Sequence, residues 1–365
     1  MSESVTAIDE ESSGTVLGRV FNAEANRYQL GVLAAAFVGL VTVPFWNPGL
    51  TYVFAFANIW VIFAVSWDII SGHTNYISFG HSFLSGLAAY TTALLTFNVD
   101  PNISMYVTFP VSVAVAVVAG LVFALPSLRL SGPYFSLLTF VSVLIATKAV
   151  FIFSEYTNGE MGISTVSVLT FDNTEMFYLT LVPALLIAGV LLYVSRSNVG
   201  LVLRAIGQNE PAVEAAGLDT MKFKLWGFVY SAVPMGIGGA LLAHFFGNVE
   251  PIAFLIVDRS IEMIAIAAVG GMGTILGPVG GAYLIIFLRD ELFRAFLGPN
   301  ARWVAVWTVV LVLLVTSPEG IFTRLWRRLG RLGGSEPEDA SAAVTGQGSD
   351  STGGERRVGD GGESE

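Results

Sequence analysis

The stretch Arg204-Ala205-Ile206-Gly207-Gln208-Asn209-Glu210-Pro211-Ala212-Val213-Glu214-Ala215-Ala216-Gly217-Leu218-Asp219 is a short charged segment between two long apolar segments. The first turn of a helix tolerates Pro211, because the N–H group that proline lacks would have no partner there. Glu210 and Glu214 place negative charge in the early turns, where the helix dipole favours it. Gly217 can adopt the left-handed conformation that ends many helices. The segment therefore predicts a short helix that ends at Gly217.

The predicted helix has a small, shallow face formed by Ala212, Val213, Ala215 and Ala216. An Ala/Glu helix of about two turns is too short to be stable alone. A face of this kind suits close docking into a groove of another protein. We therefore expect a docking surface on a partner to complete this helix.

The composition is that of a membrane protein. Hydrophobic residues make up 54 % of the chain and charged residues 13 %, whereas a soluble domain carries about 25 % charged residues. Several windows of roughly 20 residues are almost free of charge, which is the length needed to cross a bilayer. The chain has no cysteine, which excludes disulfides and thiolate chemistry. These features predict an all-α polytopic integral membrane protein.

The apolar spans predict about 8–10 transmembrane helices. Their approximate ranges are 30–47, 51–71, 77–97, 103–126, 134–154, 176–195, 223–247 and 303–317. Between the last two lies a glycine-broken helix pair near 261–272 and 276–297, divided by the glycines of 270–277. Broken helices at membrane depth occur where protein or a water-filled cavity satisfies the freed backbone groups, and in transporters they border the substrate path.

Cationic residues indicate which loops are cytoplasmic, because Lys and Arg accumulate on that side. They are Arg19, Arg27, Arg129, Arg196, Arg204, Lys222, Lys224, Arg324, Arg327, Arg328 and Arg331. A single crossing over 261–288 would put the last four of these outside, whereas two helical pieces put them inside. We therefore expect a cytoplasmic N-terminal tail over 1–28, a transmembrane domain over 29–330, a cytoplasmic loop over 196–222 and a disordered acidic tail over 331–365.

Polar residues in or near the spans are candidates for a substrate path, because ionisable groups are costly in a membrane and often functional. Asp68 could instead cap a helix or reach the interface, and His81 could make one interhelical hydrogen bond. Lys148 could face a substrate carboxylate, pair with an acidic neighbour or extend to the interface. The candidate path residues are Asn75, Ser78, His81, Lys148, Gly270, Gly271 and Gly273.

Several kinds of chemistry find no support in the sequence. The histidines are His73, His81 and His244, and no His/Asp/Glu cluster has the spacing of metal ligands. A Walker loop needs Gly-Lys-Ser/Thr, and none of the three lysines follows a glycine. No catalytic nucleophile or paired catalytic carboxylates stand out. We expect no metal, no cofactor, no nucleic-acid partner and no ATP hydrolysis by this chain.

Four segments carry a family resemblance that covers nearly the whole membrane body. They are Tyr76-Ile77-Ser78-Phe79-Gly80-His81 with Gly86, Ala89 and Tyr90; Leu128-Arg129-Leu130-Ser131-Gly132-Pro133-Tyr134-Phe135; Leu203 through Gly217; and Ala268-Val269-Gly270-Gly271-Met272-Gly273-Thr274-Ile275-Leu276-Gly277-Pro278. The closing Ser317-Pro318-Glu319-Gly320 also fits. Together they resemble the LivM-type permease subunit of branched-chain amino-acid ABC importers. Two departures are the position of Gly217 directly after Glu-Ala-Ala and the lack of a glycine expected in the turn over 72–75.

The resemblance implies an ABC-importer permease bundle in the plasma membrane. Its implied partners are a second homologous permease, two cytoplasmic ATPase subunits that use the ATP, an external substrate-binding protein and the lipid bilayer. It implies that the loop over 196–222 contains the coupling helix that engages an ATPase. The residues assigned to coupling are Arg204, Glu210, Ala212, Glu214, Ala215, Ala216 and Gly217.

Other readings remain open at this point. The resemblance favours branched-chain or other apolar amino acids as substrates, with urea and short amides as the alternative in the same family. An ion-coupled secondary transporter would need coupling carboxylates at mid-membrane, and the chain has little there besides Asp68. A passive channel would also tolerate glycine-broken helices. Neither of these two explains the Glu-Ala-Ala segment, and a membrane enzyme lacks a nucleophile or metal cluster.

Overall fold

A computed structural model describes residues 27–130 and 132–331 of the chain. Within these ranges the chain is almost wholly helical, and the pairing of extended backbone is limited to an isolated bridge between Ile163 and Val249. The predicted all-α class is confirmed. The predicted tails over 1–28 and 331–365 lie outside the described residues except for the helix ends at 27, 28 and 331, and Ser131 also lies outside them.

Five long helices are apolar enough to cross a membrane. They are α5 (Pro48–Trp67) with its π-helical extension η1 (Asp68–Gly72), α7 (Met105–Ser127), α8 (Pro133–Ile152), α10 (Asn173–Arg196) and α12 (Thr220–Phe246). A sixth candidate is α17 (Pro299–Thr316) with α18 (Ile321–Arg331), which are bent by 43° against each other.

Four more helices of the bundle are shorter or more polar than these. They are α3 (Arg27–Val41), α6 (His81–Asn98), α14 (Val257–Gly270) and α15 (Leu276–Phe287). Among the described residues, fewer than 8 helices are both long and apolar. The predicted number of about 8–10 is reached when these four helices are included. The reason is physical: α6 buries hydroxyls and a histidine, and α14 and α15 are short because glycines interrupt them.

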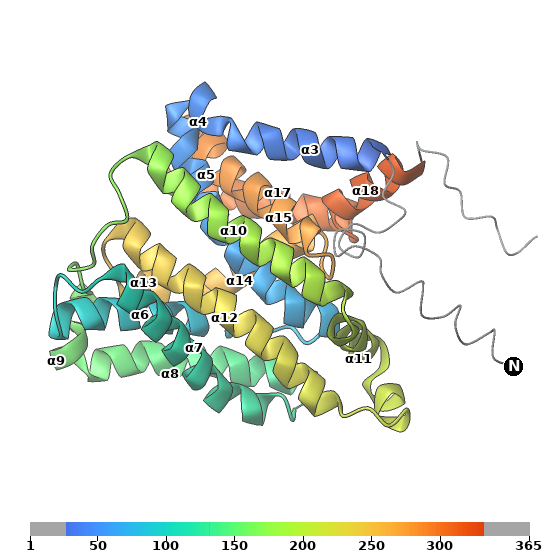
Figure 1. Cartoon of the computed structure of the whole chain (residues 1–365), viewed down its shortest axis with the longest axis horizontal. Coiled ribbons are helices and arrows are strands. Elements are labelled where there is room, and N and C mark those ends of the chain that lie inside the picture. The colour runs from blue at the N-terminus through green and yellow to red at the C-terminus, as the bar shows by residue number, and fades with distance from the viewer. Residues whose placement is uncertain (1–26, 131, 332–365) are drawn as a thin grey trace, which may run out of the picture.

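In the described ranges, six short helices and the 18-residue α11 connect the bundle helices. They are α4 (Val43–Trp46), α9 (Ser154–Thr157), η2 (Gly159–Met161), α11 (Asn198–Ala215), α13 (Pro251–Phe254), η3 (Leu288–Leu292) and α16 (Phe293–Phe296). Figure 1 shows α11, α18 and the start of α3 at one end of the bundle, hereafter the α11 end, and α4, α9 and α13 at the opposite end, hereafter the α13 end. The Gln29 side chain joins α3 to α18 by donating to the carbonyl oxygen of Trp326 at 3.0 Å.

The glycine-broken pair is an antiparallel hairpin of α14 and α15. A Cβ atom added at Gly281 would overlap the carbonyl oxygen of Ile266, and one added at Gly270 would overlap that of Gly277. Only glycine permits two helix backbones to lie this close. The break itself contains Ile275 at φ +59°, a conformation that a β-branched residue rarely adopts. The predicted division into two helical pieces is confirmed.

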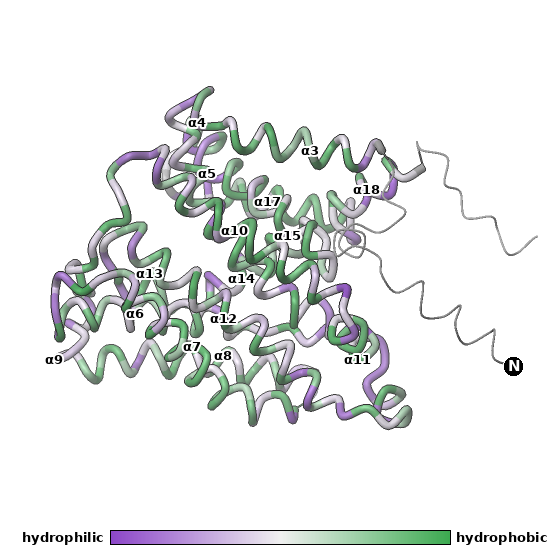
Figure 2. The backbone as a smooth tube through the Cα atoms, in the orientation of Figure 1, coloured by the Kyte–Doolittle hydropathy of each residue, from purple (hydrophilic) through white to green (hydrophobic). Residues whose placement is uncertain are grey.

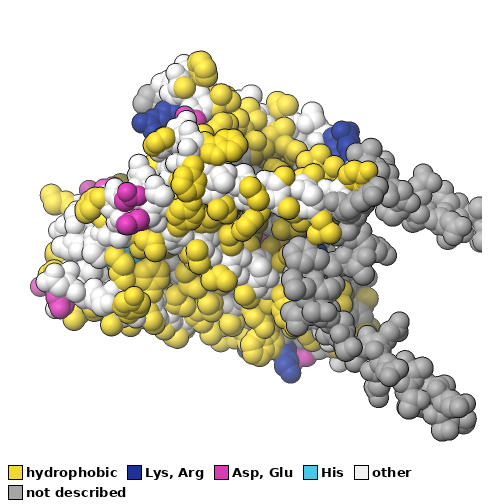
Figure 3. Space-filling model, turned by 45° about the horizontal axis from the view of Figure 1, so that its top comes forward, with side chains coloured by type: hydrophobic (Ala, Val, Ile, Leu, Met, Phe, Trp, Pro, Cys, Tyr) yellow, Lys and Arg dark blue, Asp and Glu magenta, His cyan; other side chains and the backbone are white. Residues whose placement is uncertain are grey.

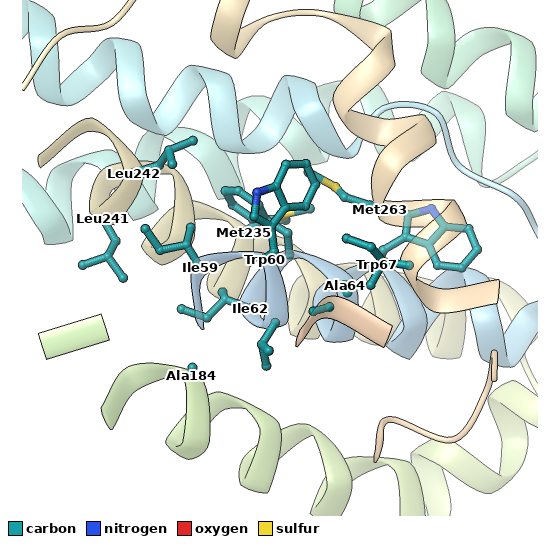
Figure 4. Packing of buried hydrophobic residues seen from close by; sticks show 14 of the residues in the cluster. Ile59, Trp60, Ile62, Ala64, Trp67, Ala184, Met235, Leu241, Leu242 and Met263 are labelled. Carbon is teal, nitrogen blue, oxygen red and sulfur yellow. The ribbon is translucent and has the colours of Figure 1, made fainter. Parts of the chain in front are cut away.

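Helix α5 is the centre of the bundle and packs against α10, α12, α14 and α15. Its large side chains Trp60, Phe63 and Trp67 are almost fully buried, and Figure 4 shows Trp60 beside Met235 of α12 and Met263 of α14. Burial of aromatic rings is the largest contribution a side chain makes to a core. The helices α10, α12, α14 and α15 are therefore held together by one central helix.

Apolar side chains also cover the outside of the bundle. Valines 111, 115, 118 and 122 of α7 are more than a third exposed. Figure 2 shows hydrophobic stretches along the long helices and hydrophilic ones at the bundle ends, and in Figure 3 hydrophobic side chains spread over the visible face while charged ones gather at its margins. Such an apolar belt matches a hydrocarbon environment.

Candidate coupling site

Helix α11 is divided at Asn209, whose backbone (φ −159°, ψ 91°) is not helical. The Asn209 side-chain oxygen accepts a hydrogen bond from the N–H group of Ala212 at 3.2 Å, which is the interaction of an N-cap residue. Pro211 follows in the first turn, where it removes no needed donor. The predicted short helix therefore exists as a separate piece behind this cap.

The same piece ends at Gly217, which adopts φ +84°. The N–H group of Leu218 then reaches back to the carbonyl oxygen of Val213 at 3.3 Å. This arrangement satisfies a terminal carbonyl group at the helix end, and it confirms the predicted local role of Gly217.

Ala212, Ala215 and Ala216 are all exposed on this piece, as are Pro211 and Glu214. The three alanines are three and four positions apart and so share one side of the helix. Val213, which the sequence placed on the same face, is instead 8 % exposed and packs toward the bundle. At 100° per residue, Val213 lies about 160° from Ala215 but only about 60° from Ala216, so it sits at the side of the alanine face that turns toward the bundle. The small exposed side chains of this face are therefore the three alanines, with Pro211 beside them.

Glu210 points into the bundle. Its carboxylate forms an ion pair with Lys224 of α12 at 2.6 Å and accepts a hydrogen bond from the Tyr76 hydroxyl. Burial alone would raise the pKa of Glu210, but the hydrogen bonds from Lys224 and Tyr76 outweigh it and hold this pKa below its usual value. Burial, and then the hydrogen bond to Glu210, raise the pKa of Tyr76. Glu210 therefore anchors the short helix to the bundle, and its side chain is 17 % exposed.

Two other predicted coupling residues also make internal contacts. Arg204 donates from Nη2 to the carbonyl oxygen of Ser195 at the end of α10. Glu214 is exposed and accepts a hydrogen bond from the Thr220 hydroxyl at 2.8 Å. These contacts join both halves of α11 to the helices that precede and follow it.

The turn after η1 also contacts α11. Asn75 adopts φ +58°, and asparagine tolerates this left-handed conformation better than most residues. It thereby takes the role of the glycine that the sequence pattern lacks in this turn. The Asn75 side chain donates to the carbonyl oxygen of Gly207 in α11 at 2.9 Å.

His73 links this turn to both α10 and η1. Its Nδ1 lies 3.0 Å from the carbonyl oxygen of Asp68, and its Nε2 lies 2.7 Å from the Ser195 hydroxyl. Since a carbonyl oxygen only accepts, Nδ1 is the donor, and in the neutral ring Nε2 then accepts from the Ser195 hydroxyl. Burial lowers the pKa of His73 to about 4, and the nearby Arg204 contributes in the same direction.

The Asp68 side chain occupies the glycine break. Oδ1 accepts from the N–H group of Gly273 at 2.7 Å, and Oδ2 accepts from that of Ile275 at 3.1 Å. The residue is 0 % exposed. Of the two readings of Asp68, the structure supports the capping one: its carboxylate satisfies backbone groups that precede α15.

The candidate path residues do not form one site. His81 is buried, with Nδ1 3.0 Å from the Ser78 hydroxyl and Nε2 2.8 Å from that of Ser231, so both ring nitrogens are engaged. Lys148 lies exposed on α8, with Nζ 5.8 Å from the centre of the Phe151 ring. Gly270, Gly271 and Gly273 lie at the break with Asp68 instead. A role of these residues in transport stays a prediction.

The sequence missed the partners that fix the coupling segment. Tyr76 and Lys224 contact it through Glu210, and the Ser195 carbonyl accepts a hydrogen bond from Arg204. Tyr76 stood in a quoted motif, and Lys224 was one of only three lysines, so both were visible as unusual residues. Their contact with Glu210 spans up to 134 positions, which no local pattern reports.

We predict that the turn over 73–76 loosens from α11 as the pH falls from 6.5 toward 5. The packed state holds His73 neutral, while an opened state takes up a proton near the usual pKa of 6.5. Opening is therefore favoured in acid, by up to on the order of 3 kcal/mol once the pH nears 4. Hydrogen exchange of the amides over 73–80 measures this. The His73→Gln variant should lose the pH dependence, and pH-independent exchange in the native chain would contradict the prediction.

Comparison with known proteins places this sequence in a family. Residues 49–316 match the model described as the branched-chain amino acid transport system / permease component. The chain is 24 % identical over 307 residues to a probable branched-chain amino acid transport permease protein LivH of Methanocaldococcus jannaschii, covering 76 % of this chain and 92 % of the relative. It is 26 % identical over 234 residues to the probable LivM of the same organism, covering 60 % and 67 %.

A bacterial relative is also named as a branched-chain amino acid permease protein. The high-affinity LivH permease protein of Escherichia coli is 26 % identical over 145 residues, which cover 40 % of this chain and 46 % of that protein. No solved structure gives a significant match. The relatives carry both LivH and LivM names, so they support the shared family rather than the LivM type alone. The family model spans well over half of the chain: this protein belongs to the branched-chain amino acid transport system permease family and is a transporter subunit rather than an enzyme.

Proposed function

We propose that this chain is the permease subunit of an ATP-driven importer of branched-chain amino acids. Its partners would be a second homologous permease, two cytoplasmic ATPase subunits and an external binding protein, in the plasma membrane. The observation that carries the proposal is the exposed alanine face of Ala212, Ala215 and Ala216 on a separately capped helix. Small residues let a partner approach the backbone closely, which is what a mechanical contact requires.

The contacts between the short helix and the bundle would transmit a movement of this face. The short helix is tied through Glu210 to Lys224 and Tyr76, and the turn that bears Tyr76 also bears His73. His73 contacts the backbone of Asp68, whose carboxylate holds the glycine break. Movement of a docked ATPase would thus reach the α14–α15 hairpin through hydrogen bonds and packed helices. Such a hairpin, packed through glycines, can shift as a unit to open the path alternately to each side.

The distribution of charge supports an orientation for the bundle. Arg324, Arg327 and Arg328 of α18 lie at the α11 end, together with Arg196 and Arg204. Cations accumulate on the cytoplasmic side, so the alanine face would meet the cytoplasm, where ATP is. The α13 end would then face the external binding protein.

An ion-coupled mechanism has less support than an ATP-driven one. Asp68 is engaged in holding the glycine break, since each of its oxygens accepts a backbone N–H group, and an ion-coupled mechanism does not account for the Glu-Ala-Ala segment. Urea or a short amide remains the alternative cargo. Uptake of labelled leucine and labelled urea by vesicles with the assembled complex distinguishes the two.

We predict that Ala215→Arg abolishes coupling. A bulky cation on the alanine face overpacks the contact with the ATPase, which costs about 1–3 kcal/mol, so ATP-dependent uptake should fall about tenfold or more. Ala215→Ser changes the volume little and is the matched control. Membrane insertion of both variants is checked by immunoblotting. Native uptake by Ala215→Arg would exclude this face as the docking site.

We also predict the sidedness of the chain, which has no native cysteine. A cysteine at Ala216, at the α11 end, should react with an impermeant thiol reagent only after the cells are opened. A cysteine at exposed Asn102, in the connection between α6 and α7 at the other end, should react from outside. The reverse labelling pattern would overturn the proposed orientation.

A further inference from the structure

A second feature of the bundle is α18, the helix that follows the last apolar span. Its eleven residues are Ile-Phe-Thr-Arg-Leu-Trp-Arg-Arg-Leu-Gly-Arg, which include four arginines, five large apolar side chains and no carboxylate. The helix is about 16 Å long and alone is too short to cross a bilayer. It is bent by 43° against α17 and lies at the α11 end of the bundle (Figure 1). A short basic and apolar helix at the end of a span is typical of the membrane interface.

One side of α18 is fixed against the α14–α15 hairpin through glycines. A Cβ atom added at Gly271 would overlap the hydroxyl of Thr323, and one added at Gly280 would overlap the ring of Phe322. A Cβ atom added at Gly320, directly before α18, would overlap the backbone of Gly271. Phe322 and Thr323 therefore mark the side of the helix that faces the hairpin, and the start of α18 touches the glycine break.

The outward side of α18 combines arginine with an apolar residue. Arg324 and Arg328 are four positions apart and share one side of the helix. At 100° per residue, the midpoint between them lies about 170° from the midpoint between Phe322 and Thr323. Leu325 borders the two arginines and is 45 % exposed. Arg324, Leu325 and Arg328 thus face away from the hairpin and are hereafter the outer face of α18.

The outer face carries positive charge that the described residues do not neutralise. Arg324 donates from Nη2 to the carbonyl oxygen of Thr316 at 2.9 Å, which is a neutral acceptor. Arg328 is exposed, and no carboxylate in the described ranges pairs with it. The neighbouring Arg327 differs, because it forms an ion pair with Glu319. Like charges four positions apart destabilise a helix, so an anion bound at Arg324 and Arg328 would stabilise α18.

We propose that the outer face of α18 binds the anionic headgroups of phospholipids. A guanidinium group donates two parallel hydrogen bonds to a phosphate, and each arginine near an anionic bilayer adds about fivefold to the affinity. The exposed Leu325 favours a bilayer over a soluble phosphate, since it would pack among the first carbons of the acyl chains. In the proposed orientation these lipids belong to the cytoplasmic leaflet, but the binding itself requires neither that orientation nor the importer.

Lipid on the outer face would influence the glycine break. The opposite side of α18 contacts Gly271, and the carboxylate of Asp68 accepts the N–H group of Gly273, two residues further along the chain. A lipid that holds α18 in place therefore also holds the break between α18 and Asp68. We expect the amides over 271–277 to exchange hydrogen more slowly when anionic lipid is bound.

Native mass spectrometry of the purified full-length chain in detergent tests the binding, with dioleoylphosphatidylglycerol and dioleoylphosphatidylcholine as the probes. Phosphatidylglycerol should bind about fivefold more tightly or better. The double variant Arg324→Gln with Arg328→Gln should bind phosphatidylglycerol about tenfold more weakly and phosphatidylcholine as before. The double variant Arg324→Lys with Arg328→Lys keeps both charges and should keep most of the preference.

Two controls locate the lipid on α18. Arg129→Gln removes an exposed cation in the connection between α7 and α8 and should leave the preference unchanged. In nanodiscs, replacing part of the phosphatidylcholine with phosphatidylglycerol should slow hydrogen exchange over 321–330 and 271–277. The double glutamine variant should lose this effect.

Several outcomes would overturn the proposal. They are equal affinities for the two lipids, wild-type binding of phosphatidylglycerol by the double glutamine variant, and equal losses in the glutamine and lysine variants, because charge would then not decide the binding. Displacement of the lipid by glycerol 1-phosphate, which has no acyl chains, would assign the outer face to a soluble phosphate. A lipid preference that arises only after Glu336→Gln, Glu338→Gln and Asp339→Asn would show that the acidic C-terminal segment, rather than lipid, occupies α18.

Discussion

The buried carboxylate of Asp68 is the interaction on which the rest of the structure depends. A helix that breaks inside a bundle leaves backbone N–H groups without partners, and a buried carboxylate without hydrogen bonds is equally costly. Asp68 removes both costs, because its two oxygens accept the N–H groups of Gly273 and Ile275. One side chain on the central helix α5 thereby fixes the position of the α14–α15 hairpin.

This interaction also connects the break to the segment that contacts α11. On one side, the Asp68 backbone contacts His73, and the same turn holds α11 through Asn75 and Tyr76. On the other side, α14 extends away from Gly270 at the break to its first residue, Val257. A helix of 14 residues is about 20 Å long and moves as a stiff rod. A displacement that reaches the break would therefore be carried along α14.

The sequence predicts well those features that depend on neighbouring residues. Pro211 and Gly217 bound the short helix by rules that act within one or two turns, and the glycines over 270–277 divide the hairpin because only glycine permits such close packing. It predicts poorly what depends on distant partners. The inward turn of Glu210 needs Lys224 and Tyr76, and the Asp68 contacts span more than 200 positions.

The ratio of leucine transported to ATP hydrolysed by the assembled complex, compared between the native chain and Asp68→Asn, tests the central claim most directly. The amide keeps the size of the side chain but replaces one acceptor oxygen with an NH₂ donor, which faces a backbone N–H group and breaks one of the two bonds to the hairpin. The alanine face is untouched, so ATP hydrolysis should continue. The account predicts that the ratio falls, because motion no longer reaches α14. A native ratio in Asp68→Asn would contradict the account.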